Sequence, residues 1–483
     1  MQLPEKEFVF NFSKVDYSSR TNNFIQKLVF ICQQHSNSAL KCHMGNIRRM
    51  IDTNDTGEMP CTDATGGLLY RLVWKWHFLA ALYVLPFMMM LSLTGGIYLF
   101  KPQIESWLYA DAFYVSPESD TLSYEDQIAA VEVAVGITRL RGVTTYDDPN
   151  RSTKIEFNDI HKVRSYAWVN PYTGEVLKVA SRDKMAMRVL RKFHGELLLG
   201  SFGTKFVEAA AHWAVVMFAT GLFLWWPRGQ RTLIKAVSLP TGIGRSWWRE
   251  THLFTGFLAT ILIVPIIFSG LPWTDVWGGS LKYIQEQTDT KSKSLRFGGS
   301  APNSTTNEGD TITYAMVFEV AKKQGLVAPY ETRPPKNNEA AFWLRSASID
   351  RTEQTELIID QYSGTVLKRH NFGDNPALAQ TVSYGISFHQ GELYGWLNIA
   401  QNTFAALVGV VLSVSGFAAW WMRRPAGSLG VPAAPDAALS NGMIILIIGL
   451  AIFFPLMGGT LVLALVLDWL IFRHLGWFRA RTN

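Results

Sequence analysis

The stretch FHGELLLG, residues 193–200, occurs a second time in altered form as FHQGELYG, residues 388–395. Each copy has a histidine in second place, and these two residues, His194 and His389, lie 195 positions apart. Repetition at a long, fixed spacing indicates that one structural unit is used twice. We therefore interpret the chain as an internal duplication, and the repeated unit decides the fold.

The repeat extends well beyond the octets. Matched residues lie 175 positions apart early in the chain, 190 further on, and 195 at and after the octets. A Ser/Thr/Gly-rich insertion near residues 287–310 accounts for most of this growth in spacing. The matched features are His77 with His252, Thr94-Gly95 with Ser269-Gly270, YTGEVL (172–177) with YSGTVL (362–367), Gly221 with Gly416, and Trp225-Trp226 with Trp420-Trp421.

Four apolar segments are long enough to cross a membrane. Hydrophobic residues make up 48% of the 483 residues and charged residues only 17%, below the roughly 25% of a soluble domain. A spanning helix needs about 20 apolar residues. We expect an α-helical membrane protein with a four-helix core, in which two parallel repeats are related by an axis along the membrane normal. The expected spans are residues 67–101, 204–227, 251–273 and 393–422.

A fifth apolar run, residues 442–473, is interrupted by Pro455 and by Gly458-Gly459. It forms either one more span or a helical hairpin. The basic residues between Arg473 and Arg481 favour a hairpin that returns to the cytoplasm, because basic flanks stay on that side.

The basic residues indicate the orientation of the chain. Residues 228–250 contain five Lys and Arg residues and one acid. The positive-inside rule places this loop, residues 423–441 and the N-terminus in the cytoplasm. The long connections, residues 102–203 and 274–392, then lie in the periplasm of a bacterium, with the chain in its inner membrane. Topology thus explains the net charge of +6, and we expect no nucleic acid partner.

Each long connection is predicted to be a small α+β module. An N-cap residue and an apolar stripe indicate a helix at its start, and alternating strands around a Thr-Gly or Ser-Gly turn follow. The expected helices are residues 123–135 and 313–324, and the expected strands lie within 154–157, 166–179, 341–349 and 356–368.

The first 66 residues are polar and contain all three cysteines. Cys32, His35, Cys42 and His43 lie close together, but their spacing fits no common zinc finger. We expect residues 1–66 to be either a disordered extension or the result of a translation start that was assigned too far upstream.

Four of the ten histidines respect the repeat: His77, His252, His194 and His389. The pseudo-twofold axis places His77 opposite His252 near the cytoplasmic face and His194 opposite His389 near the periplasmic face. Two facing imidazoles supply both axial ligands of a haem iron, whereas zinc or copper sites have three or four converging ligands. Because no C-x-x-C-H motif occurs, we expect two non-covalent b haems and no catalytic acid, base or nucleophile.

Glycines and basic residues complete the predicted haem sites. We expect Gly95, Gly195, Gly270 and Gly391 to let a flat ring approach the backbone. The residues expected to meet haem propionates are Arg71, Lys75 and Arg249 on the inner side and Arg188, Arg191 and Lys192 on the outer side.

Other interpretations of the histidines stay open. An interfacial histidine is often only a hydrogen-bonded residue, and duplication alone can preserve a structural contact. His212 has no counterpart, since Leu407 occupies the equivalent position. It is the reserve haem ligand in place of His194, or a hydrogen-bond partner of Glu208, because polar groups within spans are usually functional.

Several segments resemble the PepSY-associated transmembrane proteins of bacteria. They are WKWHFLAALYVLPFMMMLSLTGGIYLF, FHGELLLG, TGLFLWWPR, THLFTGFLATILIVPIIFSGLPW and SGFAAWWMRRP, while VNPYTGEVL and IDQYSGTVL resemble the turn of a PepSY module. The resemblance runs from about residue 69 to the C-terminus. It implies an iron-regulated inner-membrane protein similar to dihaem ferric-siderophore reductases, with the four repeated histidines on the family's recurring positions and His212 outside the pattern.

We therefore expect an electron-transfer protein that reduces a ferric chelate, foremost a siderophore, in the periplasm and so releases iron. No Gly-rich dinucleotide fingerprint follows a strand, so the electrons come from a cytoplasmic partner, a quinol or a flavin. The alternative is a PepSY membrane protein without enzymatic activity, which binds peptides or regulates a periplasmic protease and whose histidines are structural.

Overall fold

The computed structural model divides the chain into two compact units, Met1–Gly66 and Gly67–Asn483. The second unit holds the whole repeat. The predicted cysteine and histidine cluster and most of the predicted extension lie outside the described residues, although helix α2 begins at Thr62, before the predicted start of the first span. The structure describes residues 62–228, 232–295, 301–304, 309–432 and 439–470.

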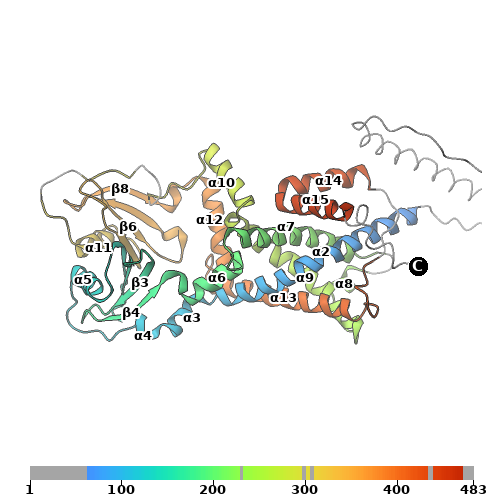
Figure 1. The fold of residues 1–483 in the computed structure, drawn as a ribbon, viewed down its shortest axis with the longest axis horizontal. Coiled ribbons are helices and arrows are strands. Elements are labelled where there is room, and N and C mark those ends of the chain that lie inside the picture. Colours follow the sequence, from blue (N-terminus) through green and yellow to red (C-terminus); the bar gives the residue numbers. More distant parts are fainter. Residues whose placement is uncertain (1–61, 229–231, 296–300, 305–308, 433–438, 471–483) are drawn as a thin grey trace, which may run out of the picture. The chain divides into compact units, whose positions relative to one another are not determined.

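Four long helices form a bundle (Figure 1). Each is long and apolar enough to cross a membrane, so the predicted four-helix core is confirmed in length and composition. The boundaries shift by a few residues, most at the third helix, which already begins at Arg245 and includes the end of the predicted loop. The helices are α2 (Thr62–Tyr98), α7 (Ser201–Trp225), α9 (Arg245–Gly270) and α13 (Trp396–Trp421).

The middle of the bundle is packed through small side chains. Ala214, Ala259 and Ala405, from three different helices, are buried together with Val84 of α2. Lipid is as apolar as these side chains, so membrane helices associate mainly through close packing of small residues. The four histidines that respect the repeat lie outside this packed middle, towards the two ends of the bundle.

The segments between the spans build one continuous antiparallel sheet with the strand order β4-β3-β2-β1-β5-β6-β7-β8. The two predicted modules are thus halves of a single sheet, joined where β1 pairs with β5 and Val143 lies opposite Thr332. The strands are β1 (Arg139–Thr145), β2 (Thr153–Asn158), β3 (Arg164–Val169), β4 (Val176–Ser181), β5 (Tyr330–Arg333), β6 (Phe342–Ser346), β7 (Thr355–Ile359) and β8 (Val366–Asn371).

Two helices cover one face of this sheet, α5 (Tyr124–Val135) and α11 (Tyr314–Lys323). Their predicted N-caps are confirmed, because the hydroxyls of Ser123 and Thr313 each accept a hydrogen bond from a backbone N–H of the first turn, which satisfies donors that a helix start leaves free. Alternate strand residues bury an apolar core beneath them, including Ile155, Phe157, Leu344, Leu357 and Ile359.

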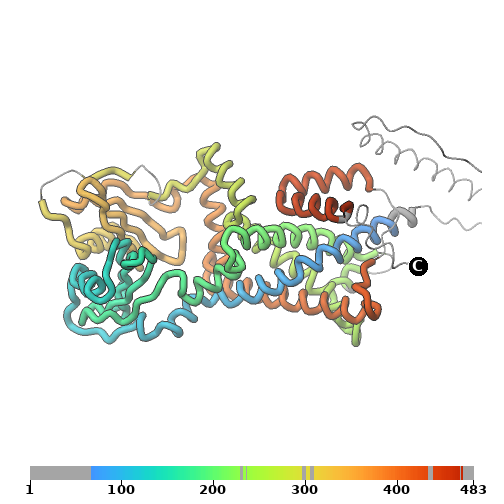
Figure 2. Tube along the Cα trace, in the orientation of Figure 1, coloured from blue at the N-terminus to red at the C-terminus, as the bar shows by residue number. Residues whose placement is uncertain are grey.

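The other face of the sheet looks towards the bundle (Figure 1) and is polar. The ladder places Lys154 beside Trp168, and Glu331 accepts hydrogen bonds from Arg345 across the strands. Short helices link this face to the spans, and Figure 2 follows the chain through them in each half. They are α3 (Lys101–Leu108), α4 (Ala110–Phe113), α6 (Ala186–Glu196), α10 (Trp277–Gln287) and α12 (Ala377–Gln390), while α8 (Leu233–Ala236) lies between the two halves.

The fifth apolar run forms two short helices, α14 (Asn441–Phe453) and α15 (Pro455–Asp468), which lie side by side (Figure 1). Neither is as long as the four spans. Phe454, between them, is buried against Leu271 in a small apolar cluster that includes residues of α7. The pair therefore covers α7 and the end of α9, and it breaks the pseudo-symmetry of the bundle.

Candidate functional site

Each octet forms the corner between a connecting helix and a span. α6 ends at Glu196 and α12 at Gln390, within two residues of their histidines, and the residues that follow, Leu197 and Gly391, adopt the left-handed conformation. Gly200 and Gly395 then precede α7 and α13 with φ angles of 60° and 67°. These angles suit glycine because it lacks a Cβ atom. The repeated octet therefore turns the chain into the membrane and holds a histidine at that turn.

The two octet histidines meet. The ring centroids of His194 and His389 lie 6.3 Å apart, with the ring planes at 78°. An iron bonded to one nitrogen of each ring, at about 2 Å per bond, would hold the centroids roughly 6 Å apart. Burial, together with His389 and Arg191, lowers the pKa of His194 to about 3. The spacing and the neutral ring both fit axial ligation of a haem iron.

The hydroxyl of Thr94 fixes the tautomer of His194. Thr94 Oγ1 donates to the carbonyl oxygen of Met90 at 2.7 Å and lies 2.8 Å from His194 Nδ1. A hydroxyl has a single proton to donate, so it accepts the second hydrogen bond from Nδ1–H. The lone pair of the imidazole is then on Nε2, the tautomer that metal-ligating histidines adopt when their other nitrogen is held by a partner.

The same arrangement recurs at two further histidines. Ser269 Oγ donates to Ile266 and lies 3.2 Å from His389 Nδ1, which is also 2.9 Å from the carbonyl oxygen of Ile266. Thr220 Oγ1 donates to its own helix and lies 3.0 Å from His77 Nδ1. In each case the hydrogen bond holds Nδ1 and leaves the Nε2 lone pair available.

The fourth histidine reaches the same state through a carbonyl group. Nδ1 of His252 lies 3.2 Å from the carbonyl oxygen of Leu412, which can only accept. Ser415 corresponds to Thr220 in the repeat, but its hydroxyl donates to the same Leu412 carbonyl at 3.1 Å. All four repeated histidines therefore present Nε2 with its lone pair.

A glycine lies beneath each of the four rings, immediately after the Ser or Thr residue. A Cβ atom placed on it would come within 2.9 to 3.3 Å of the histidine Cε1 atom, closer than ordinary contact. Each Ser/Thr-Gly pair is thus a cradle for one imidazole. The pairs are Gly95 with His194, Gly221 with His77, Gly270 with His389 and Gly416 with His252. Gly95 and Gly270 were expected to admit a porphyrin ring but face a histidine ring instead, whereas Gly195 and Gly391 contact no histidine ring.

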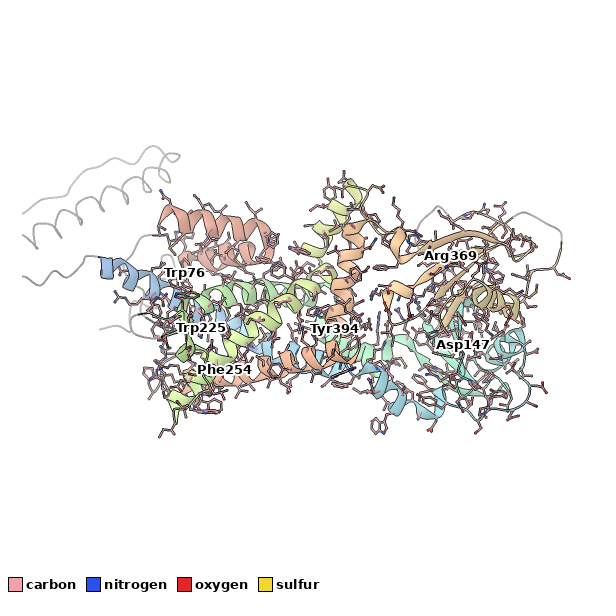
Figure 3. The ribbon with its side chains drawn as sticks, turned by 180° about the vertical axis from the view of Figure 1, so that it is seen from behind. Trp76, Asp147, Trp225, Phe254, Arg369 and Tyr394 are labelled. Atoms are coloured by element: carbon pink, nitrogen blue, oxygen red, sulfur yellow. The ribbon has the colours of Figure 1, made fainter. Side chains whose placement is uncertain are left out.

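The two histidine pairs lie at different depths. His77 and Gly95 are 18 residues apart on α2, which corresponds to about 27 Å along a helix. Figure 3 shows the two ends of the bundle, with Tyr394 next to the sheet and Trp225 at the far end. His194 and His389 therefore belong to the sheet end, and His77 and His252 to the far end.

The far-end pair lines a cavity of about 580 Å³ with a largely apolar wall. This volume is within the range of cofactor sites. Arg249 lines it as predicted, together with Arg245 and Arg423, whereas Arg71 and Lys75 do not. Arg245 was missed because α9 was expected to begin later. Three arginines in the lining of a largely apolar cavity fit the two carboxylates and the flat ring of haem.

At the sheet end, Arg188 and Arg191 line a second cavity, of about 390 Å³. Lys192 instead pairs with Asp183 at 3.1 Å. Among the described residues, no group of three or more His, Cys, Asp or Glu side chains is placed to hold a metal ion.

His212 is not brought together with the other histidines. It is fully buried in α7, and its ring centroid lies 4.9 Å from that of Phe454. Its Nε2 atom is 3.7 Å from Glu208, too long for a hydrogen bond, while Glu208 accepts the backbone N–H groups of Val276 and Trp277. The structure thus places the reserve ligand under the C-terminal helix pair.

Comparison with protein families gives a match. The profile of the PepSY-associated TM region matches residues 74–423, which include all four repeated histidines, both octets and the whole sheet. No curated protein matches the chain. Since the matched segment covers most of the chain, the protein belongs to the PepSY-associated transmembrane family.

Proposed function

We propose that the protein is a dihaem b electron-transfer protein that reduces a ferric chelate on the side of its sheet. The observation that carries the proposal is the shared state of the four repeated histidines, each with Nδ1 held by a hydrogen bond and Nε2 left with its lone pair.

The chain's own residues supply binding and orientation. His194 and His389 would hold one haem and His77 and His252 the other, while the glycine cradles and hydroxyls fix each ring. Arg245, in the far-end cavity, provides charge for a haem carboxylate. Bound haem b contributes a reversible one-electron couple at each level.

The overall reaction moves electrons from one side of the membrane to the other. A reduced flavin or a quinol on the far side is oxidised by two electrons and releases its protons there, and two ferric ions on the sheet side each become ferrous. The arginine-rich far end favours a cytoplasmic position, which would place the sheet in the periplasm of a bacterium. Ferrous iron then leaves the chelate, because siderophores hold it much less tightly.

Reconstituted vesicles test this proposal. The full-length protein is reconstituted with reductant enclosed, and a ferric chelate and a ferrous-specific dye are added outside. We expect ferrous iron to form outside at a rate that His194→Ala or His77→Ala reduces at least tenfold, while His161→Ala, at an exposed loop, has no effect. Equal rates in all variants, or no absorption spectrum of b haem in the purified protein, would refute the proposal.

A further inference from the structure

The cavity at the sheet end is strongly basic and partly aromatic. It lies between the polar face of the sheet, α3 and α6, and has a volume of about 390 Å³. Phe113, Tyr146, Tyr166 and Trp168 contribute aromatic rings, and Glu105 is its one acidic lining residue. The basic lining residues are Lys101, Arg151, Lys154, Arg182, Arg188 and Arg191.

Some of these cations are neutralised and some are not. Lys101 lies 4.0 Å from Glu105, Arg188 pairs with Asp183, and Arg191 with Glu196. Among the described residues, Arg151, Lys154 and Arg182 make no ion pair, although Glu331 and Glu156 also interact electrostatically with Lys154. The lining of the cavity, with six basic residues and one acid, carries a net positive charge.

The geometry of two of these cations indicates a missing acceptor. The Nε atom of Arg151 is buried and has no hydrogen-bond partner among the described residues, although its guanidinium stacks 4.2 Å from the Tyr146 ring. The Nε atom of Arg191 is likewise buried without a hydrogen-bond partner among the described residues. Buried donors without acceptors are costly, and an anionic ligand would satisfy them.

The duplication provides an independent comparison, because the other half lacks this chemistry. The sheet register and the repeat spacing match Lys154 to Trp343 and Arg182 to Phe372. In the second half Leu295, from the insertion, is buried against Trp343 and Ile358. One copy of the unit thus keeps an open cavity at Lys154 and Arg182, where the other copy has Trp343 and Phe372 and covers Trp343 with Leu295. A feature present in only one half is not needed for the fold that both halves share.

We propose that this cavity binds an anionic, aromatic ferric chelate of the tris-catecholate class. Three dianionic catecholates around one ferric ion make a trianionic complex, whose charge is opposite to that of the basic lining and whose rings match the aromatic wall. Arg191 precedes His194 by one helical turn on α6, so a ligand here lies next to the sheet-end histidine pair. This inference specifies the class of ferric substrate and therefore rests on the proposed function. Binding of the chelate can nevertheless be tested without electron transfer.

The test uses gallium(III), which takes the place of ferric ion and is not reduced. Full-length protein in phosphatidylcholine nanodiscs is dialysed against a trianionic gallium tris-catecholate, and bound gallium is counted. A neutral gallium tris-hydroxamate is the comparison ligand. We expect the anionic complex to bind at least tenfold more tightly, and Lys154→Met and Arg182→Gln each to weaken it about tenfold. Lys323→Met removes an exposed charge on α11, away from the cavity, and should change nothing.

Several results would overturn the inference. Equal affinity for the two complexes would do so, as would unchanged binding in both cavity variants when these remain folded by circular dichroism. Loss of haem in Lys154→Met with chelate binding unchanged would assign the cavity to haem carboxylates. Displacement of the complex by phosphatidylglycerol added to the nanodiscs, with no binding preference otherwise, would assign it to lipid headgroups. Protein without haem that still binds the gallium complex would refute the proposed function and leave this site intact.

Discussion

The imidazole rings of His194 and His389, 195 positions apart in the chain, lie 6.3 Å apart in the folded protein. Each is presented by an identical device, a helix that ends at a repeated octet and a Ser/Thr-Gly pair on the neighbouring span. One half of the duplication provides one ring only, so this site exists because the chain contains the unit twice.

The sheet-end pair should be separable from the far-end pair. His389→Ala should remove one haem and leave the other, because His77 and His252 do not depend on the octet. Haem content and the reduced-minus-oxidised spectrum measure this, with His161→Ala as the exposed control. Full retention of both haems in His389→Ala and in His194→Ala would show that these residues are not ligands.

The hydroxyl of Thr94 should affect the haem without being a ligand. Thr94→Val keeps the shape of the side chain but removes the acceptor of His194 Nδ1–H. Loss of such a supporting hydrogen bond typically weakens metal binding by about 10- to 100-fold. We expect weaker haem retention and a shifted midpoint potential, with Thr94→Ser restoring both. Identical potentials in Thr94→Val and the unaltered protein would contradict this assignment.

The glycine cradles should not tolerate a methyl group. A Cβ atom on Gly270 would lie 2.9 Å from Cε1 of His389, so Gly270→Ala should displace the ring and lower the haem content towards one per chain. Gly449, on α14, has open space at the same position, and Gly449→Ala should retain both haems. Retention of two haems in Gly270→Ala would mean that the ring does not need this cradle.

His212 should be dispensable for haem binding. Both of its ring nitrogens are buried without hydrogen-bond partners among the described residues, which costs about 1–3 kcal/mol. His212→Leu, which installs the residue found at the equivalent position Leu407, should therefore keep both haems and leave thermal stability unchanged or raised. Loss of a haem in this variant would make His212 a ligand after all.

The joint between the two halves of the sheet should be sensitive at Gly142. A Cβ atom there would lie 2.6 Å from the backbone oxygen of Thr332, on the neighbouring strand β5. We expect Gly142→Ala to destabilise the sheet by roughly 1–3 kcal/mol, seen as a lower unfolding temperature of the sheet. Gly373→Ala, at a position with open space, is the control and should have no such effect.

Much of this architecture follows from the sequence because its causes are local or repeated. Apolar length predicts the spans, Ser123 and Thr313 predict two helix starts, and the duplication predicts which histidines share a level. The single sheet was not foreseen, since β1 (RLRGVTT) and β5 (YETR) show no apolar alternation and pair through backbone groups.

The contacts that hold the histidine rings, and the basic cavity, could not be predicted from the sequence. The match of Thr220-Gly221 with Ser415-Gly416 was available as a signal, but the hydrogen bond of His252 to the Leu412 carbonyl depends on tertiary packing. The basic cavity joins Lys154 on a strand with Arg182 after another strand, and no periodicity relates residues brought together in this way.

The haem content of the purified protein tests the central claim most directly. Pyridine haemochrome analysis of full-length protein from haem-replete cells, set against the protein concentration, should give a b-type spectrum and about two haems per chain, one for each histidine pair. A ratio near zero would contradict the claim that the four repeated histidines are haem ligands.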